Sequence, residues 1–152
     1  MDVSGESPRD GHRLLQVGIL LFLLALLVGL AVPRFAVPRL ALSTHLLGIM
    51  QGTFLMVSGL LWPRLRLTRP LSRLGCGLAI YGCFAAWTAN LCGAVWGAGS
   101  SMMPIAAGQA RGSAIQEGAI RVGLMTGAAS LIIAAILILW GLRNSPTEGS
   151  TK

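Results

Sequence analysis

The sequence has few charged side chains and even fewer acidic ones. Of its 152 residues, 11% are charged, and only five are aspartate or glutamate. None of these five acids lies in any of the long apolar stretches of the chain. A proton relay or cation pathway through a membrane normally uses a carboxylate inside the span. This absence therefore argues against a multidrug or proton-coupled transporter.

Histidine and cysteine are also scarce. The chain has two histidines and three cysteines, with no CxxC pair and no Cys/His cluster, so it supports neither a structural zinc site nor an iron-sulfur centre. Cys76 and Cys83 would lie about 10 Å apart along one helix, too far for a disulfide, and we expect both to pack as small apolar residues. An electron-carrying cytochrome would need a second axial histidine, and His12 lies outside the first apolar stretch.

Apolar residues are abundant instead. They make up 54% of the chain, and the mean hydropathy is +0.72. Four stretches, residues 14–32, 42–62, 74–97 and 122–142, are each about 20 residues long and can cross a hydrocarbon layer about 30 Å thick. The sequence therefore predicts an all-α fold, an integral membrane four-helix bundle over residues 13–143, with polar tails at 1–12 and 144–152.

The first stretch follows two arginines, as the apolar core of a cleaved signal peptide would. This core is longer than the roughly 7 to 15 residues of a signal, and Pro33-Arg34-Phe35 stands where small residues should mark a cleavage site. We therefore expect a retained helix.

The formal net charge of +7 is carried by residues at helix ends and in short connections, which does not suit a nucleic-acid partner. With both termini on one side of the membrane, that side carries eight basic residues and the other side four. Because an excess of lysine and arginine marks the cytoplasmic side, both termini are predicted to be cytoplasmic.

Small residues form a stripe along the third apolar stretch. They recur at spacings of three or four, at Gly75, Ala79, Gly82, Ala86, Asn90, Gly93 and Gly97. Such stripes let helix backbones approach closely in lipid, where burial of apolar side chains does not drive association. Asn90 is the only strongly polar residue of the stripe, so we expect it to face protein.

Three residues near helix ends have simpler interpretations. We expect Trp62 and Trp96 to anchor their helices at the membrane interface. Glu117 precedes the fourth apolar stretch, where its charge would favour the helix dipole in a capping role.

His45 lies near the start of the second stretch, and Gln51 lies roughly 9 Å deeper and about 120° around the helix. Asn90 approaches the same membrane face from the antiparallel third helix. An ionisable ring inside a membrane segment costs free energy and is therefore a candidate functional group. The residues alone leave two roles open for His45: an interhelical hydrogen bond, or ligation of a metal or haem iron by a neutral imidazole.

Three segments carry a family pattern: Leu27 to Pro33, Leu42 to Phe54, and Trp96 to Gly99 together with Met103 to Ala106. Together they resemble the bacterial hydroxylaminobenzene mutase family, whose members are small four-helix membrane proteins that isomerise hydroxylaminobenzene to 2-aminophenol. That family is similar to styrene oxide isomerase, which converts an aryl epoxide to an aldehyde with a haem b held by one histidine between subunits of a trimer.

The resemblance implies several properties of this chain. It implies a small aromatic substrate, a haem b cofactor with no nicotinamide or flavin, a homo-oligomer such as a trimer, and the inner membrane of a bacterium. Both reactions break a bond to oxygen beside an aryl-stabilised cation, and a Lewis-acidic iron would assist without net redox chemistry.

Individual residues can be carried over from the resemblance. Styrene oxide isomerases have Asn-Gly six residues after the haem histidine, and Gln51-Gly52 follows His45 at that spacing. The haem-ligand role therefore carries to His45. A further Asn and Tyr of the isomerase pocket fall near Ala86 and Asn90 in an ungapped alignment, and neither matches, which favours the mutase over epoxide chemistry. We expect Gln51 and Asn90 to be catalytic residues that orient the substrate. The alternatives are an epoxide isomerase of the styrene oxide type, a transporter subunit and a purely structural membrane subunit.

Overall fold

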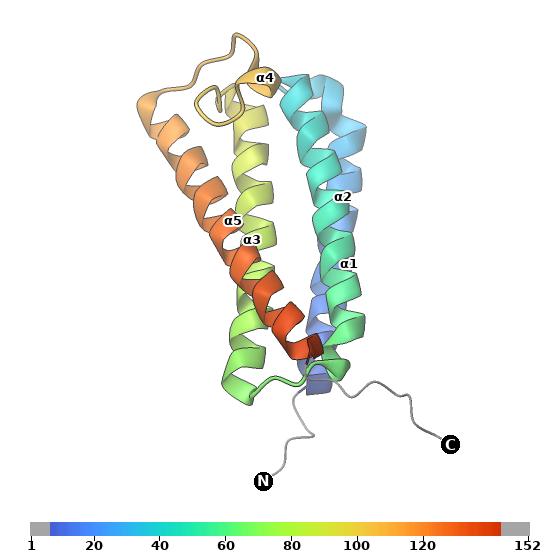
Figure 1. Ribbon diagram of the computed structural model, residues 1–152. Coiled ribbons are helices and arrows are strands. Elements are labelled where there is room, and N and C mark those ends of the chain that lie inside the picture. Colours follow the sequence, from blue (N-terminus) through green and yellow to red (C-terminus); the bar gives the residue numbers. More distant parts are fainter. Residues whose placement is uncertain (1–6, 144–152) are drawn as a thin grey trace, which may run out of the picture.

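The chain folds into four long helices that are joined by short connections (Figure 1). A computed structural model describes residues 7–143; the predicted tail at 144–152 and the first six residues of the chain lie outside this range. The long helices are α1 (Ser7–Ala31), α2 (Pro38–Leu61), α3 (Arg69–Trp96) and α5 (Ala114–Arg143). Single turns occupy η1 (Val32–Arg34), η2 (Trp62–Arg64) and α4 (Pro104–Ala107).

All four long helices are long and apolar enough to cross a membrane. The least buried of them are α1 and α5, with only 17% of the residues in their most apolar window buried inside the protein. The predicted all-α four-helix membrane bundle is confirmed, and lipid or other protein must cover the leucines and isoleucines exposed on α1 and α5.

The helices begin before the predicted hydrocarbon spans. The start of α1 at Ser7 precedes the predicted Leu14, and α5 begins at Ala114 rather than at Val122. Hydropathy detects only the part that can lie in hydrocarbon, whereas the hydrogen-bonded helix continues into the polar headgroup layer. The start of α5 is fixed by a capping box: Gln116 N–H donates to the Ser113 hydroxyl (3.3 Å), and Ser113 N–H donates to Gln116 Oε1 (2.8 Å).

Helices α1 and α2 pack against each other along a seam of glycines. A Cβ at Gly11 would lie 2.8 Å from the Gly59 carbonyl oxygen, and a Cβ at Gly18 would lie 2.8 Å from that of Gly52. Both relations are reciprocal, because a Cβ at Gly52 or Gly59 would meet the opposite carbonyl at 2.8 or 2.7 Å. The two backbones therefore touch at these pairs, as small residues permit in membrane helices.

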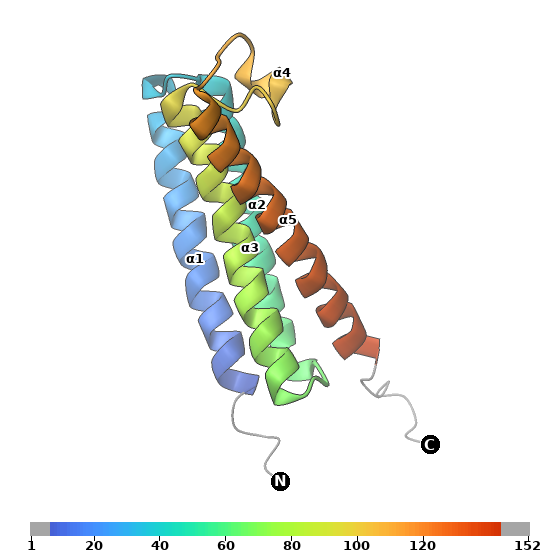
Figure 2. The same cartoon turned by 90° about the vertical axis from the view of Figure 1, so that its left-hand side faces the viewer.

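Helix α5 packs mainly on α3, and both views show it inclined to the other three helices (Figure 2). The two backbones approach closely at Gly82 of α3, where a Cβ would lie 2.9 Å from the Gly127 carbonyl oxygen. Higher up, a Cβ at Gly123 would lie 2.8 Å from Ala89 Cβ. Small residues on both helices thus fix the position of α5.

Two predictions about helix ends are wrong. Trp62 is no interface anchor: it is 1% exposed, its indole N–H donates to Ser72 Oγ (2.9 Å), and Ser72 donates to Asp10 Oδ2 (2.9 Å). Gly97 does not continue the stripe of α3, because its φ of 67° makes it the left-handed residue that ends the helix. Trp96, 44% exposed at the end of α3, is placed as an anchor would be.

Candidate functional site

His45 lies on the face of α2 that packs against α1. Its Nδ1 is 2.8 Å from the carbonyl oxygen of Ala25. Because a carbonyl oxygen only accepts, this contact favours the neutral tautomer with its proton on Nδ1 and its lone pair on Nε2. The imidazole is half-buried, and it occupies the space beside Gly29, where a Cβ would lie 2.5 Å from Nδ1.

Trp87 of α3 reaches the turn of α2 that follows His45. A Cβ at Gly48 would lie 2.6 Å from the indole nitrogen of Trp87 and 2.6 Å from Ala25 Cβ. The indole therefore fits against α2 only because residue 48 is a glycine. Trp87 is 7% exposed, and its buried N–H has no hydrogen-bond partner.

Asn90 lies between α3 and α2. Its side-chain nitrogen donates to Ser43 Oγ at 3.2 Å, while its buried Oδ1 has no partner. The residue is 3% exposed, which confirms that it faces protein rather than lipid.

Gln51 is also buried, at 7% exposure, and its Oε1 has no partner. The S–H of Cys83 on α3 points to the backbone oxygen of Gln51 at 3.9 Å, so this turn of α2 lies against α3. A buried polar atom without a partner costs about 1–3 kcal/mol, and such atoms are rare unless a ligand or water meets them.

The predicted site residues are divided between two faces of α2. Gln51 and the Ser43 partner of Asn90 face α3, whereas His45 faces α1. Trp87 connects the two faces, because its indole lies over Gly48, one turn from His45. The structure thus places His45, Trp87 and Asn90 on neighbouring turns toward one end of the bundle. Among residues 7–143, the buried side-chain polar atoms without a partner are Gln51 Oε1, Trp87 Nε1 and Asn90 Oδ1.

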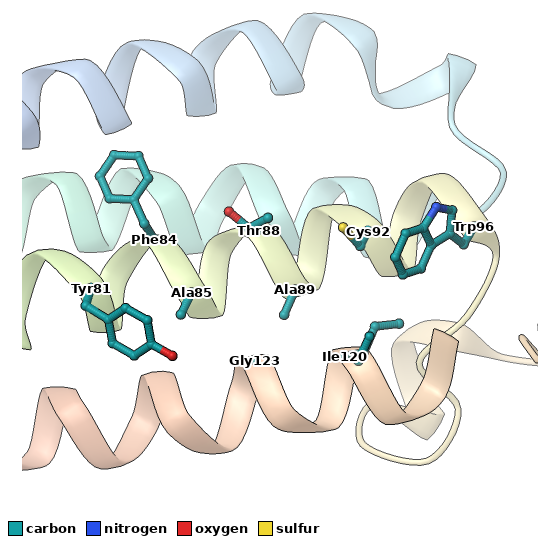
Figure 3. Close-up of a pocket in the computed structure, with 10 residues that line it drawn as sticks. Tyr81, Phe84, Ala85, Thr88, Ala89, Cys92, Trp96, Ile120 and Gly123 are labelled. Carbon is teal, nitrogen blue, oxygen red and sulfur yellow. The ribbon is translucent and has the colours of Figure 1, made fainter. Parts of the chain in front are cut away.

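A pocket of about 390 Å³ lies on the opposite flank of α3, between α3 and α5 (Figure 3). Its lining comprises Tyr81, Phe84, Ala85, Thr88, Ala89, Cys92, Trp96, Ala119, Ile120 and Gly123. Tyr81 donates to Thr126 Oγ1 at 2.9 Å. At about 100° per residue, Thr88 lies roughly 160° around α3 from Asn90. This pocket is therefore separate from the site formed by His45, Trp87 and Asn90. Its lining has no carboxylate and no imidazole, so it offers no strong acid or base for catalysis.

Glu117 holds the loop between α3 and α5 by hydrogen bonds. Its carboxylate accepts five hydrogen bonds, from the backbone N–H groups of Gly99, Ser100, Ser101 and Gly112 and from the Ser100 hydroxyl, at 2.7 to 3.3 Å. The predicted capping role therefore describes Glu117 only in part. Gln116 forms the capping box with Ser113, whereas Glu117 accepts hydrogen bonds from the loop between α3 and α5.

Comparison with known proteins decides the family. The family model described as styrene oxide isomerase matches residues 10–143. The chain belongs to the styrene oxide isomerase family. It is 48% identical over 140 residues to hydroxylaminobenzene mutase HabB of Ectopseudomonas oleovorans, covering 92% of this chain and 85% of the relative. It is 38% identical over 125 residues to hydroxylaminobenzene mutase HabA of the same organism, covering 82% and 93%. No solved structure matches the chain.

This member of the styrene oxide isomerase family is an isomerase, or mutase, built into a four-helix membrane bundle. The sequence pointed to His45, Gln51 and Asn90 but not to Ala25 and Gly29, which surround the histidine. The signal for these two is their spacing of seven and eleven residues from Gly18 on α1. The position of Trp87 against α2 depends on Gly48, the glycine opposite it.

Proposed function

We propose that this chain isomerises an aryl hydroxylamine such as hydroxylaminobenzene to 2-aminophenol, using a haem b held by His45. Two relatives that match most of the chain are named as hydroxylaminobenzene mutases. The family model bears the name of an epoxide isomerase, so the substrate must be argued from the site.

The unpartnered oxygens of Gln51 and Asn90 carry this proposal. Both are buried acceptors that lack donors. An aryl hydroxylamine brings two donors, its N–H and its O–H, together with an oxygen lone pair that could accept from the Trp87 indole N–H. An aryl epoxide brings only an acceptor and would leave both side-chain oxygens unsatisfied. A site that requires a donor discriminates strongly against a substrate without one.

His45 has the features of an iron ligand. Its Nδ1–H is held by the Ala25 carbonyl, the arrangement that commonly orients ligating histidines and leaves Nε2 as the donor atom. Among residues 7–143, no three His, Cys, Asp or Glu side chains gather as a metal site. A single imidazole suits a porphyrin, which brings its own nitrogens, better than a bare metal ion.

When bound, the haem would supply a Lewis acid for the substrate oxygen. The protein's own residues would orient the substrate and exclude water. Gln51 and Asn90 would accept hydrogen bonds from the N–H and O–H and so orient the substrate. The N–O bond breaks, the oxygen bonds to the ortho carbon of the ring, and the proton displaced from that carbon passes to the nitrogen, so that substrate and product have the same atoms. The apolar helices would keep water from the reacting centre.

We further propose a homo-oligomer, with a trimer as the expected size, in the inner membrane of a bacterium with both termini cytoplasmic. The half-buried His45 and the broad apolar surfaces of α1 and α5 suit contacts between subunits as well as with lipid. The basic residues are concentrated at the end where α1 begins and α5 ends, which supports the orientation.

Parallel assays on two substrates test the proposed reaction. Purified protein should convert hydroxylaminobenzene to 2-aminophenol, and Gln51→Leu and Asn90→Leu should each lower kcat/KM at least about tenfold, the effect of roughly 1.4 kcal/mol. Gln16→Leu, at an exposed position of α1, is the matched control and should leave kcat/KM unchanged. Conversion of styrene oxide with no activity on hydroxylaminobenzene would instead assign the epoxide reaction.

A further inference from the structure

His45 occupies a defined step of the α1–α2 seam. The glycine pairs Gly11/Gly59 and Gly18/Gly52 are each seven residues from the next along both helices. One further step of seven brings Ala25 opposite His45, and these two residues are joined by the Nδ1 to carbonyl contact of 2.8 Å. The same antiparallel register that brings the glycine backbones together therefore places a carbonyl oxygen beside the imidazole.

Gly29 provides the space for the ring one turn further along α1. A Cβ at this position would lie 2.5 Å from Nδ1, 2.7 Å from Cε1 and 3.1 Å from Cγ of His45. Real Cβ atoms do not approach other atoms so closely, so any side chain at residue 29 must displace the imidazole. The ring is the end of a flexible side chain, and it can move without disturbing the helix backbones.

We propose that Gly29 and the Ala25 carbonyl are positioning groups for His45, which hold the ring against α1 and fix its proton on Nδ1 so that Nε2 is free to bind iron. The inference rests on the proposed haem-ligand role of His45. The position of the ring itself is independent of that role, so the two can be tested separately.

Nitrogen NMR on ring-labelled histidines measures the tautomer directly. The sample is the full-length chain in detergent, and His12→Gln assigns the two histidine signals. Exposed histidines in water favour the Nε2–H tautomer, and His12 should show it. We expect His45 to show the Nδ1–H tautomer. An Nε2–H tautomer at His45 in the wild-type chain would overturn the proposal.

Gly29→Ala tests the positioning role, and Gly77→Ala is its control because no atom lies within 4 Å of a Cβ there. Gly29→Ala should shift the His45 ring signals away from the Nδ1–H state and weaken haem retention about 10- to 100-fold, as loss of an orienting partner typically does. Gly77→Ala should change neither. Unchanged His45 signals in Gly29→Ala would overturn the role of Gly29. A third outcome separates the two proposals. If wild-type His45 shows the Nδ1–H tautomer and its ring signals shift in Gly29→Ala, but neither the wild type nor any variant binds haem, then Gly29 positions the ring and the proposed cofactor is wrong.

Discussion

The contact between α3 and α5 predicts that Gly82→Leu weakens the bundle. The Cβ alone would lie 2.8 Å from Leu131 Cγ, 2.9 Å from the Gly127 carbonyl oxygen and 3.1 Å from Leu131 N. Two of these three atoms belong to the α5 backbone, which can yield only if the helix moves. Since α5 packs mainly on α3, little else would hold it in place.

The magnitude follows from the size of the added group. Overpacking by a few carbons typically costs about 1–3 kcal/mol, and a full leucine against backbone atoms should lie at or above the upper end of this range. Gly77→Leu is the matched control on the same helix, because nothing lies within 4 Å of its Cβ. There the better helix propensity of leucine should stabilise by somewhat less than about 1 kcal/mol. The two variants should therefore change the free energy of unfolding in opposite directions.

Unfolding in mixed micelles, with the fraction of sodium dodecyl sulfate raised stepwise and helix content followed by circular dichroism, measures the difference. Gly82→Leu should unfold at a clearly lower detergent fraction than the wild type, and Gly77→Leu at an equal or higher one. Coincident transitions for the two variants would show that the seam between α3 and α5 does not support the bundle as described.

Three further predictions follow from the site. His45→Ala should abolish any Soret absorbance and most activity while expression stays normal, because the half-buried ring leaves space that α1 and lipid can fill; full colour in the variant would remove His45 as the ligand. Glu117→Ala should speed trypsin cleavage after Arg111, since five hydrogen bonds to the loop are lost, and Glu117→Gln should have a smaller effect; equal cleavage rates in all three proteins would refute the role of Glu117 in holding this loop. In ¹⁸O-labelled water the 2-aminophenol should be largely unlabelled because the apolar interior excludes bulk water, and strong labelling would contradict intramolecular transfer.

The sequence predicted the four helices because each contains about 20 consecutive, predominantly apolar residues, enough to cross the hydrocarbon layer. The burial of Asn90 was predictable as well, because a stripe of small residues that contains one amide should face another helix rather than lipid. Both predictions depend on residues within one helix, where spacing determines the face.

The remaining features depend on register between helices, which a single sequence does not encode locally. The contact of His45 with Ala25 follows from the pairing of Gly18 with Gly52, and no spacing within α2 reveals it. The five bonds to Glu117 likewise require the loop after α3 to fold back over the start of α5. Trp62 was misjudged for the same reason: its position at a helix end suggested the interface, whereas Ser72 and the start of α1 enclose it.

The proposed reaction rearranges an aryl hydroxylamine with no change in its atoms or oxidation balance. Conversion of hydroxylaminobenzene by the purified protein, without oxygen and without nicotinamide, flavin or any reductant, tests this reaction. We expect stoichiometric formation of 2-aminophenol over many turnovers. Absence of product under these conditions, or an absolute requirement for a reductant or oxygen, would contradict it.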